Sequence, residues 1–189
     1  MSEVNLVSQV VQTLLSQKQT LSFAESCTGG ALSAKITETS GVSAIFKGSV
    51  VSYANEAKAE ILGVGRDSLG QFGAVSEVVA QEMAQGVRHR FHTDWGVSVT
   101  GIAGPTGGTQ EKPVGTVWIA VAGPVFASGT RPGASKGGTG QNRSSRDPAE
   151  FGEARKFFFK GDRRQIQQQS VEAALDLLLS AMRRAASSS

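Results

Sequence analysis

The stretch FAESCTGGALSAK, residues 23–35, is the most informative part of the chain for both fold and function. It ends an apolar strand candidate over residues 20–25, turns at two glycines, and continues with a helix-like pattern over residues 30–39. Ser26 and Cys27 stand side by side at this corner. A strand that leads directly into a helix is typical of α/β proteins, and such corners are where these proteins hold their ligands.

The alternation of strands and helices continues along the rest of the chain. It predicts an α/β fold with a single domain over residues 1–189, built as a three-layer α/β/α sandwich around a mainly parallel (mixed) sheet. The expected strands are residues 20–25, 46–54, 95–104, 115–123 and 155–161, and the expected helices are residues 3–17, 30–39, 55–63, 76–91 and the segment capped by Asp162.

Length, composition and charge exclude several classes of protein. The chain has 189 residues, of which 39% are hydrophobic and 19% charged, as in an ordinary globular domain. A net charge of only +3 argues against a dedicated nucleic-acid-binding protein. A single cysteine excludes an intramolecular disulfide and Cys-rich metal sites within one chain. Neither a membrane-spanning run nor a signal peptide is recognisable, which predicts a cytoplasmic protein with no membrane partner.

Residues 123–146 break the pattern. They are rich in glycine and serine, hold four basic residues and no acidic one, and lack periodicity. We expect a flexible surface loop that extends to about residue 152. The functional alternative is a basic lid over an anionic ligand.

Ser26 is the first candidate nucleophile, because a strand-to-helix corner lifts its hydroxyl to the rim of the sheet. The backbone N–H groups of Thr28, Gly29 and Gly30 would open the next helix and could bind an oxyanion or a phosphate. The alternative is an ordinary capping turn with Thr28 as the N-cap. Cys27 competes as a nucleophile, although buried and unreactive cysteine is commoner.

A serine nucleophile needs a base, and lysine is better placed than histidine. His89 and His92 lie near the end of a predicted helix, where cations commonly interact with the helix dipole. If Asn55 caps its helix, Lys58 falls in the first turn, where the dipole and burial would both lower its pKa. Tyr53 could relay a proton. The alternative is a solvated Lys58 and a core Tyr53.

A third glycine-rich element lies between two predicted strands. Thr100 and Gly101 end the first strand, and the loop Gly104–Gly108 follows. This element is interpreted as the second wall of a nucleotide-sized pocket, with a plain strand connection as the alternative.

Five blocks of sequence follow one another along nearly the whole chain: AESCTGG, GVSAIFKGSVVSYANEAKAEILGV, GAVSEVVAQEMAQG, SVTGIAGPTGGTQEKPVGTVWIAVAG and KGDRRQIQ. Together they resemble the CinA C-terminal domain, or nicotinamide-nucleotide amidohydrolase, family. The resemblance implies hydrolysis of the carboxamide of nicotinamide mononucleotide to nicotinate mononucleotide and ammonia. It also implies a three-layer α/β/α fold, no metal or cofactor, a nucleotide as the small-molecule partner, a homodimer, and the stand-alone form of the family.

Carried over by position, the family's serine–lysine chemistry falls on Lys58 with Tyr53 and on one of two serines, Ser26 or Ser43. Arg163 would meet the phosphate. The region 123–155 departs from the family pattern. The other residues implied to line the ligand site are Thr28, Gly29, Gly30, Thr100, Gly101 and Gly104.

Two other functions are compatible with the sequence. A non-catalytic nucleotide-binding or regulatory module would bind the same ligand without releasing ammonia. A nucleic-acid-associated protein would use the basic residues 123–146, and its binding would weaken steeply with salt.

Overall fold

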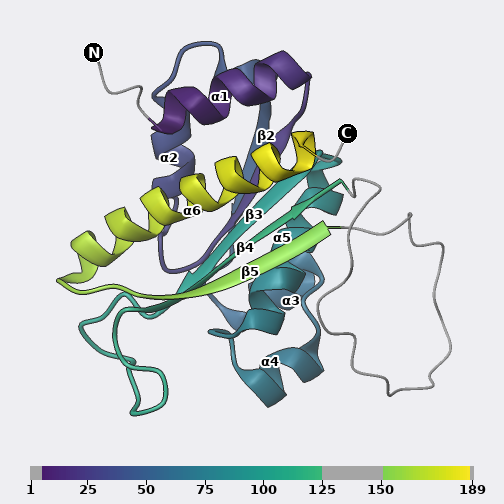
Figure 1. Cartoon of the computed structure of the whole chain (residues 1–189). Helices are drawn as coiled ribbons and strands as arrows, with labels where there is room; N and C mark the ends of the chain where they lie inside the picture. Colours follow the sequence, from purple (N-terminus) through teal and green to yellow (C-terminus); the bar gives the residue numbers. More distant parts are fainter. Residues whose placement is uncertain (1–5, 125–150, 188–189) are drawn as a thin grey trace, which may run out of the picture.

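The computed structural model describes residues 6–124 and 151–187, and it confirms the α/β prediction: a mixed five-stranded sheet lies between two layers of helices (Figure 1). The helices are α1 (Leu6–Gln17), α2 (Ala31–Thr37), a short 3-10 helix η1 (Val42–Ala44), α3 (Asn55–Leu62), α4 (Arg66–Phe72), α5 (Glu77–Phe91) and α6 (Arg163–Ala186), and the strands are β1 (Leu21–Glu25), β2 (Phe46–Val51), β3 (Trp95–Gly101), β4 (Thr116–Gly123) and β5 (Phe151–Phe158).

The strand order β2-β1-β3-β4-β5 brings three chain corners to one edge of the sheet. β1 pairs in parallel with both β2 and β3, whereas β4 is antiparallel to β3 and to β5. Four of the five strands therefore run the same way. Because β1, β2 and β3 are parallel, their carboxyl ends meet at a common edge, where ligands of such folds bind.

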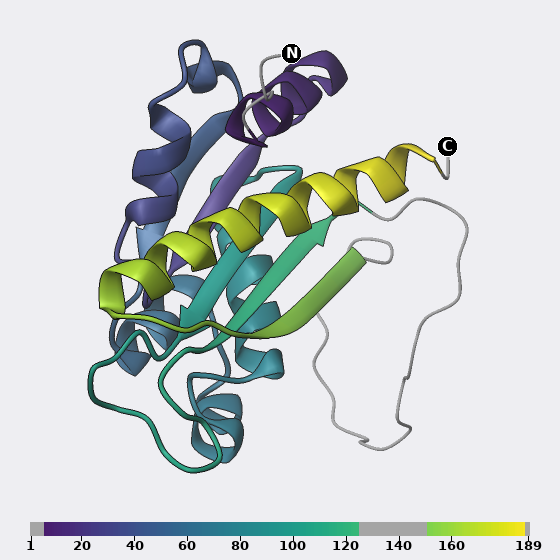
Figure 2. The same ribbon diagram turned by 60° about the vertical axis from the view of Figure 1, so that its left-hand side comes forward.

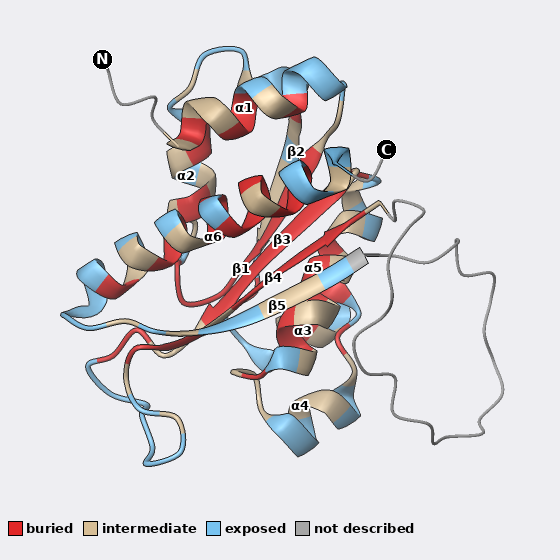
Figure 3. Ribbon diagram, in the orientation of Figure 1, coloured by how far each residue is buried: buried red, intermediate tan, exposed pale blue. Residues whose placement is uncertain are grey.

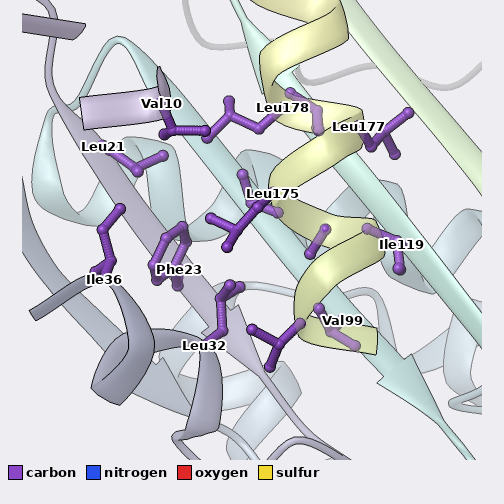
Figure 4. Close-up of a cluster of buried hydrophobic side chains, with 14 of the residues drawn as sticks. Val10, Leu21, Phe23, Leu32, Ile36, Val99, Ile119, Leu175, Leu177 and Leu178 are labelled. Carbon is purple, nitrogen blue, oxygen red and sulfur yellow. The ribbon is translucent and has the colours of Figure 1, made fainter. Parts of the chain in front are cut away.

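Helices α1, α2 and α6 cover one face of the sheet, and α3, α4 and α5 cover the other (Figures 1 and 2). The inner strands β1, β3 and β4 are buried almost throughout (Figure 3). The larger core lies under α6, where Phe23 and Leu32 meet Leu175 and Leu178 (Figure 4). Each such side chain contributes about 1.5–3 kcal/mol by leaving water, so this layer holds the sheet edge and its loops in place.

Two predicted caps are confirmed, and several predicted boundaries are corrected. Ser76 accepts a hydrogen bond from Val79 N–H at the start of α5, and Asp162 forms a capping box with Gln165 at the start of α6. The N-cap of α3 is Ala54 rather than Asn55. Residues 125–150, most of the expected loop, lie outside the described residues; Gly123, Phe151 and Gly152 belong to strands.

No helix in the described ranges 6–124 and 151–187 is both long and apolar enough to cross a membrane.

Close packing of α5 on α3 sets the position of the helix that carries Lys58. A Cβ atom at Gly86 of α5 would overlap the carbonyl oxygen of Leu62 at the end of α3. Gly86→Ala should therefore destabilise the protein by about 1–2 kcal/mol, because overpacking outweighs the roughly 1 kcal/mol gained in helix propensity. Gly70→Ala is the matched control, since Gly70 is also helical but faces open space and should not lose stability. Urea unfolding measures both, and equal effects would contradict this packing argument.

Candidate active site

A cleft of about 280 Å³ opens at the carboxyl edge of β1, β2 and β3. It brings together residues that follow all three strands, the segment before α5 and the first residue of α6. Its lining is Ser26, Cys27, Tyr53, Lys58, Ala74, Val75, Thr100, Gly101, Ile102, Ala103, Gly104, Thr106, Gly107 and Arg163.

Ser26 is fixed at the bottom of this cleft by the sheet itself. It follows the last residue of β1, and its N–H donates to the carbonyl oxygen of Val99 in β3 at 3.0 Å. The residue is 8% exposed, so its hydroxyl reaches the cleft from a largely buried backbone. A rigid strand end is a precise support for a reacting group.

Lys58 reaches Ser26 from α3. Its Nζ lies 3.0 Å from Ser26 Oγ and 2.6 Å from the carbonyl oxygen of Ser52, and the residue is only 1% exposed. No carboxylate in the described parts of the chain forms a salt bridge with it. Burial lowers the pKa of Lys58 from its ordinary value of 10.5, because an ammonium group is costly away from water. A neutral amine can donate to Ser52 and accept the proton of Ser26.

The lowered pKa of Lys58 predicts a specific pH dependence of stability. Between the native pKa of Lys58 and 10.5, the unfolded chain binds a proton that the native chain does not, so stability rises with pH through that window. Below the native pKa, Lys58 is charged in both states, and the destabilisation caused by burying its ammonium group is fully present. The free energy of unfolding of wild type should thus approach that of Lys58→Met as pH rises towards 10.5. A constant difference between the two proteins, measured by denaturant titration across this range, would contradict the lowered pKa.

Cys27 lies beside Ser26 but is poorly suited to nucleophilic attack. Its side chain is 5% exposed, and burial raises the pKa of the thiol to about 12. The thiolate is the reactive form of cysteine, and it is scarce at neutral pH when the pKa is this high. Of the two neighbouring candidates, Ser26 is favoured, because its hydroxyl contacts Lys58 Nζ whereas burial raises the pKa of the Cys27 thiol.

The expected anion cradle at the start of α2 is already occupied by the protein. The carboxylate of Glu25 accepts hydrogen bonds from Gly30 N–H at 3.0 Å and Leu32 N–H at 3.1 Å. The Gly29 amide donates to the carbonyl oxygen of Ser26. Thr28 is not the N-cap; that position belongs to Gly30. Thr28, Gly29 and Gly30 are not among the residues that line this cleft.

Tyr53 and Arg163 form the outer wall of the cleft. One guanidinium nitrogen of Arg163 donates to Tyr53 Oη at 2.7 Å, and the other donates to the carbonyl oxygen of Gly104, also at 2.7 Å. Tyr53 is 63% exposed, and its hydroxyl forms no hydrogen bond with Ser26 or Lys58 within the described residues. The alternative of a core Tyr53 is wrong, because the side chain is exposed, and its hydroxyl accepts a hydrogen bond from Arg163.

The remaining predicted residues divide between the cleft and the opposite end of the sheet. Thr100, Gly101 and Gly104 line the cleft, and Thr100 Oγ1 donates to the carbonyl oxygen of Ala74, which ties β3 to the segment before α5. Ser43 is exposed on η1, which precedes β2. The six-residue β2 separates it from the carboxyl edge by roughly 20 Å at about 3.3 Å per residue, so the structure does not bring Ser43 to Lys58.

Two partners in the site were not predicted from the sequence: the Glu25 carboxylate and the Ser52 carbonyl oxygen. A signal for Glu25 was present, because a carboxylate ended a short strand shortly before a glycine-rich helix start. The carbonyl of Ser52 has no sequence signal, since its direction depends on the backbone. Among the described residues, no three His, Cys, Asp or Glu side chains gather as a metal site would require.

The fold and the cleft define an α/β protein with a buried serine–lysine pair, and comparisons with known proteins identify its family. The model of the CinA C-terminal domain matches residues 3–147. A CinA-like protein of Fervidobacterium nodosum is 43% identical over 169 residues, 89% of this chain and 35% of that protein. A CinA-like protein of Nostoc punctiforme is 56% identical over 119 residues, 63% of this chain and 29% of that protein. The chain belongs to the CinA C-terminal domain family.

Solved structures of the same superfamily share the fold along almost the whole chain. A CinA superfamily protein from Klebsiella pneumoniae has a TM-score of 0.78 at 28% identity, covering 97% of this chain and 99% of that one. The competence/damage inducible protein CihA from Agrobacterium tumefaciens has a TM-score of 0.78 at 32% identity, covering 95% and 98%. The chain spans 29–35% of the length of the two curated relatives named above.

Proposed function

We propose that this protein hydrolyses the carboxamide of nicotinamide mononucleotide to nicotinate mononucleotide and ammonia, a step of pyridine nucleotide salvage. The observation that carries the proposal is the 3.0 Å contact between Lys58 Nζ and Ser26 Oγ in the cleft. A buried lysine without a carboxylate partner suits a general base, and a serine on a strand end suits a nucleophile. The family resemblance supplies the substrate.

In the proposed mechanism, neutral Lys58 takes the proton of Ser26 Oγ as this oxygen attacks the amide carbon. Cys27 directly follows Ser26 and lines the cleft, and its N–H group is the proposed oxyanion donor. Collapse of the tetrahedral intermediate breaks the C–N bond, and the Lys58 ammonium gives its proton to the –NH₂ leaving group, which departs as ammonia. Water, deprotonated by Lys58, then hydrolyses the ester and restores Ser26.

The substrate phosphate is proposed to bind at the outer wall rather than at the start of α2. Arg163 contributes the positive charge there, and the N–H groups of Gly104, Thr106 and Gly107 have no acceptor in the described residues. No aspartate or glutamate is among the described residues that line the cleft. A guanidinium with nearby free amides suits a phosphate group, which supports a mononucleotide over an uncharged amide.

The test compares ammonia release from nicotinamide mononucleotide, nicotinamide riboside and nicotinamide at equal concentrations. We expect release from the mononucleotide, and a loss of about tenfold or more in kcat/KM for the riboside, because it lacks the phosphate that Arg163 would bind. Hydrolysis of free nicotinamide at the same rate would contradict the proposed substrate.

Tyr53→Phe tests whether the phenol relays protons. Because the hydroxyl contacts Arg163 rather than Ser26 or Lys58, we expect kcat to fall less than about tenfold, well below the roughly 100-fold or greater loss typical of a missing proton-transfer group. Steady-state ammonia release measures the change. A loss of about 100-fold or more would assign the relay to Tyr53 after all.

A non-catalytic nucleotide-binding module remains the second candidate function, supported by the unpaired amides of the outer wall. It predicts saturable binding of the mononucleotide with no release of ammonia.

The homodimer and the cytoplasmic location stay predictions. Sedimentation equilibrium tests the homodimer. The four basic residues proposed for nucleic-acid binding all lie outside the described residues.

A further inference from the structure

We infer that Glu25 is a positioning residue that fixes Ser26 and Lys58 in their positions relative to each other. The inference rests on the proposed function, since it concerns the same nucleophile and base. Glu25 is 0% exposed and lies outside the cleft lining, so it acts through the backbone rather than on the substrate.

The Glu25 carboxylate is fully occupied by donors from the start of α2. Its Oε2 accepts from Gly30 N–H and Leu32 N–H, and its Oε1 accepts from Ser33 N–H at 2.9 Å and Ser33 Oγ–H at 2.5 Å. Hydrogen bonds to a charged acceptor are stronger than neutral ones. The side chain thus clamps the helix start against the end of β1.

These hydrogen bonds close a turn over residues 25–30 that contains the nucleophile. Ser26 directly follows Glu25, and Gly30 is bound back to the Glu25 carboxylate, so the chain between them forms a loop with both ends fixed. Within the loop, Gly29 N–H donates to the Ser26 carbonyl oxygen at 3.1 Å. Gly29 and Gly30 have φ values of 61° and 101°, which a side chain would disfavour. The direction of the Ser26 side chain follows from this closed turn.

The backbone of Glu25 also leads to Lys58. Its carbonyl oxygen accepts the Ser52 N–H at 2.8 Å, and the Ser52 carbonyl oxygen accepts from Lys58 Nζ at 2.6 Å. One residue is therefore joined to the nucleophile by a peptide bond and to the base through two hydrogen bonds. Misplacement of either reacting group by about 1 Å can cost roughly 100-fold in rate.

Replacement by glutamine keeps the shape of Glu25 and breaks the clamp. Whichever way the amide is turned, its NH₂ group faces at least one backbone N–H: Ser33 on one side, or Gly30 and Leu32 on the other. A turn with unsatisfied amides relaxes, and Ser26 moves with it. Substrate contacts at the outer wall, around Arg163, are unaffected by this change.

The test measures kcat, KM and the rate at which phenylmethylsulfonyl fluoride labels Ser26, mapped by peptide mass spectrometry. Glu25→Gln should lower kcat and labelling about tenfold or more, with KM within about threefold. Glu38→Gln, which removes an exposed carboxylate paired with Lys35 near the other end of α2, should change neither. If Glu25→Gln fails to fold, Ser33→Ala tests the inference instead. This variant removes the hydroxyl that donates to Glu25 Oε1, and we expect labelling of Ser26 to slow about threefold.

Labelling of Ser26 at the wild-type rate in Glu25→Gln, or in Ser33→Ala if the first variant does not fold, would overturn the inference. So would wild-type protein that is not labelled at Ser26. If the wild type is labelled and Glu25→Gln slows the reaction, but nicotinamide mononucleotide yields no ammonia, the positioning role stands and the proposed amidase function fails.

Discussion

Lys58→Met is expected to abolish ammonia release from nicotinamide mononucleotide, with a loss of about 1,000-fold or more, because Lys58 is the base that contacts Ser26 Oγ in the described part of the chain. Methionine fills nearly the same space as the lysine stem, so the loss reports the amine rather than a cavity. Lys47→Met is the matched control: its Nζ also donates to a backbone carbonyl, that of Ala44, but it is exposed and lies at the opposite end of β2. Its activity should stay within about twofold of wild type.

The same substitution should make the protein more stable. A buried amine without a carboxylate partner is costly, and methionine removes that cost, although the Ser52 carbonyl oxygen loses a donor worth about 1 kcal/mol. We expect a net gain of about 1 kcal/mol near neutral pH, or about 2–4 °C in Tm for a domain of this size. Differential scanning calorimetry measures it. A clear destabilisation, or activity that survives the substitution, would contradict the assignment of Lys58 as a catalytic base whose burial lowers the stability of the protein.

Ser26→Ala should abolish turnover to a similar extent, about 1,000-fold or more, because the ester intermediate cannot form. Ser43→Ala is expected to retain wild-type activity, since Ser43 lies on η1 beyond the far end of β2. Ammonia release by the two purified variants, each checked for folding, decides which of the two serines is the nucleophile, a question that the sequence left open. An active Ser26→Ala beside an inactive Ser43→Ala would reverse the assignment.

Most of the fold could be predicted because its signals are local. Hydrophobic periodicity marks α1, α5 and α6, and β-branched runs mark β3 and β4, whose residues are buried almost throughout. The helix α4 was not predicted, since its seven residues contain a glycine and none of them is buried. Its position depends on packing against α5, which the local sequence does not encode.

The candidate site was predictable where residue type and strand ends decide it. Ser26 and Lys58 were expected from a strand-to-helix corner and a first-turn lysine, and the structure places them together. The role of Glu25 was not predicted, because a carboxylate seven positions before Leu32 meets it only after the turn closes. The partner of Tyr53 was missed for a related reason: Arg163 lies 110 residues away in sequence.

The measurement that tests the central claim most directly follows nicotinamide mononucleotide, nicotinate mononucleotide and ammonia together in the presence of the purified wild-type protein, with binding measured in parallel by calorimetry. We predict many turnovers per protein, with ammonia and nicotinate mononucleotide formed in equal amounts, and intact binding without turnover for Ser26→Ala. Saturable binding by the wild type, with the nucleotide recovered unchanged and no ammonia formed, would contradict the amidase and favour a nucleotide-binding module.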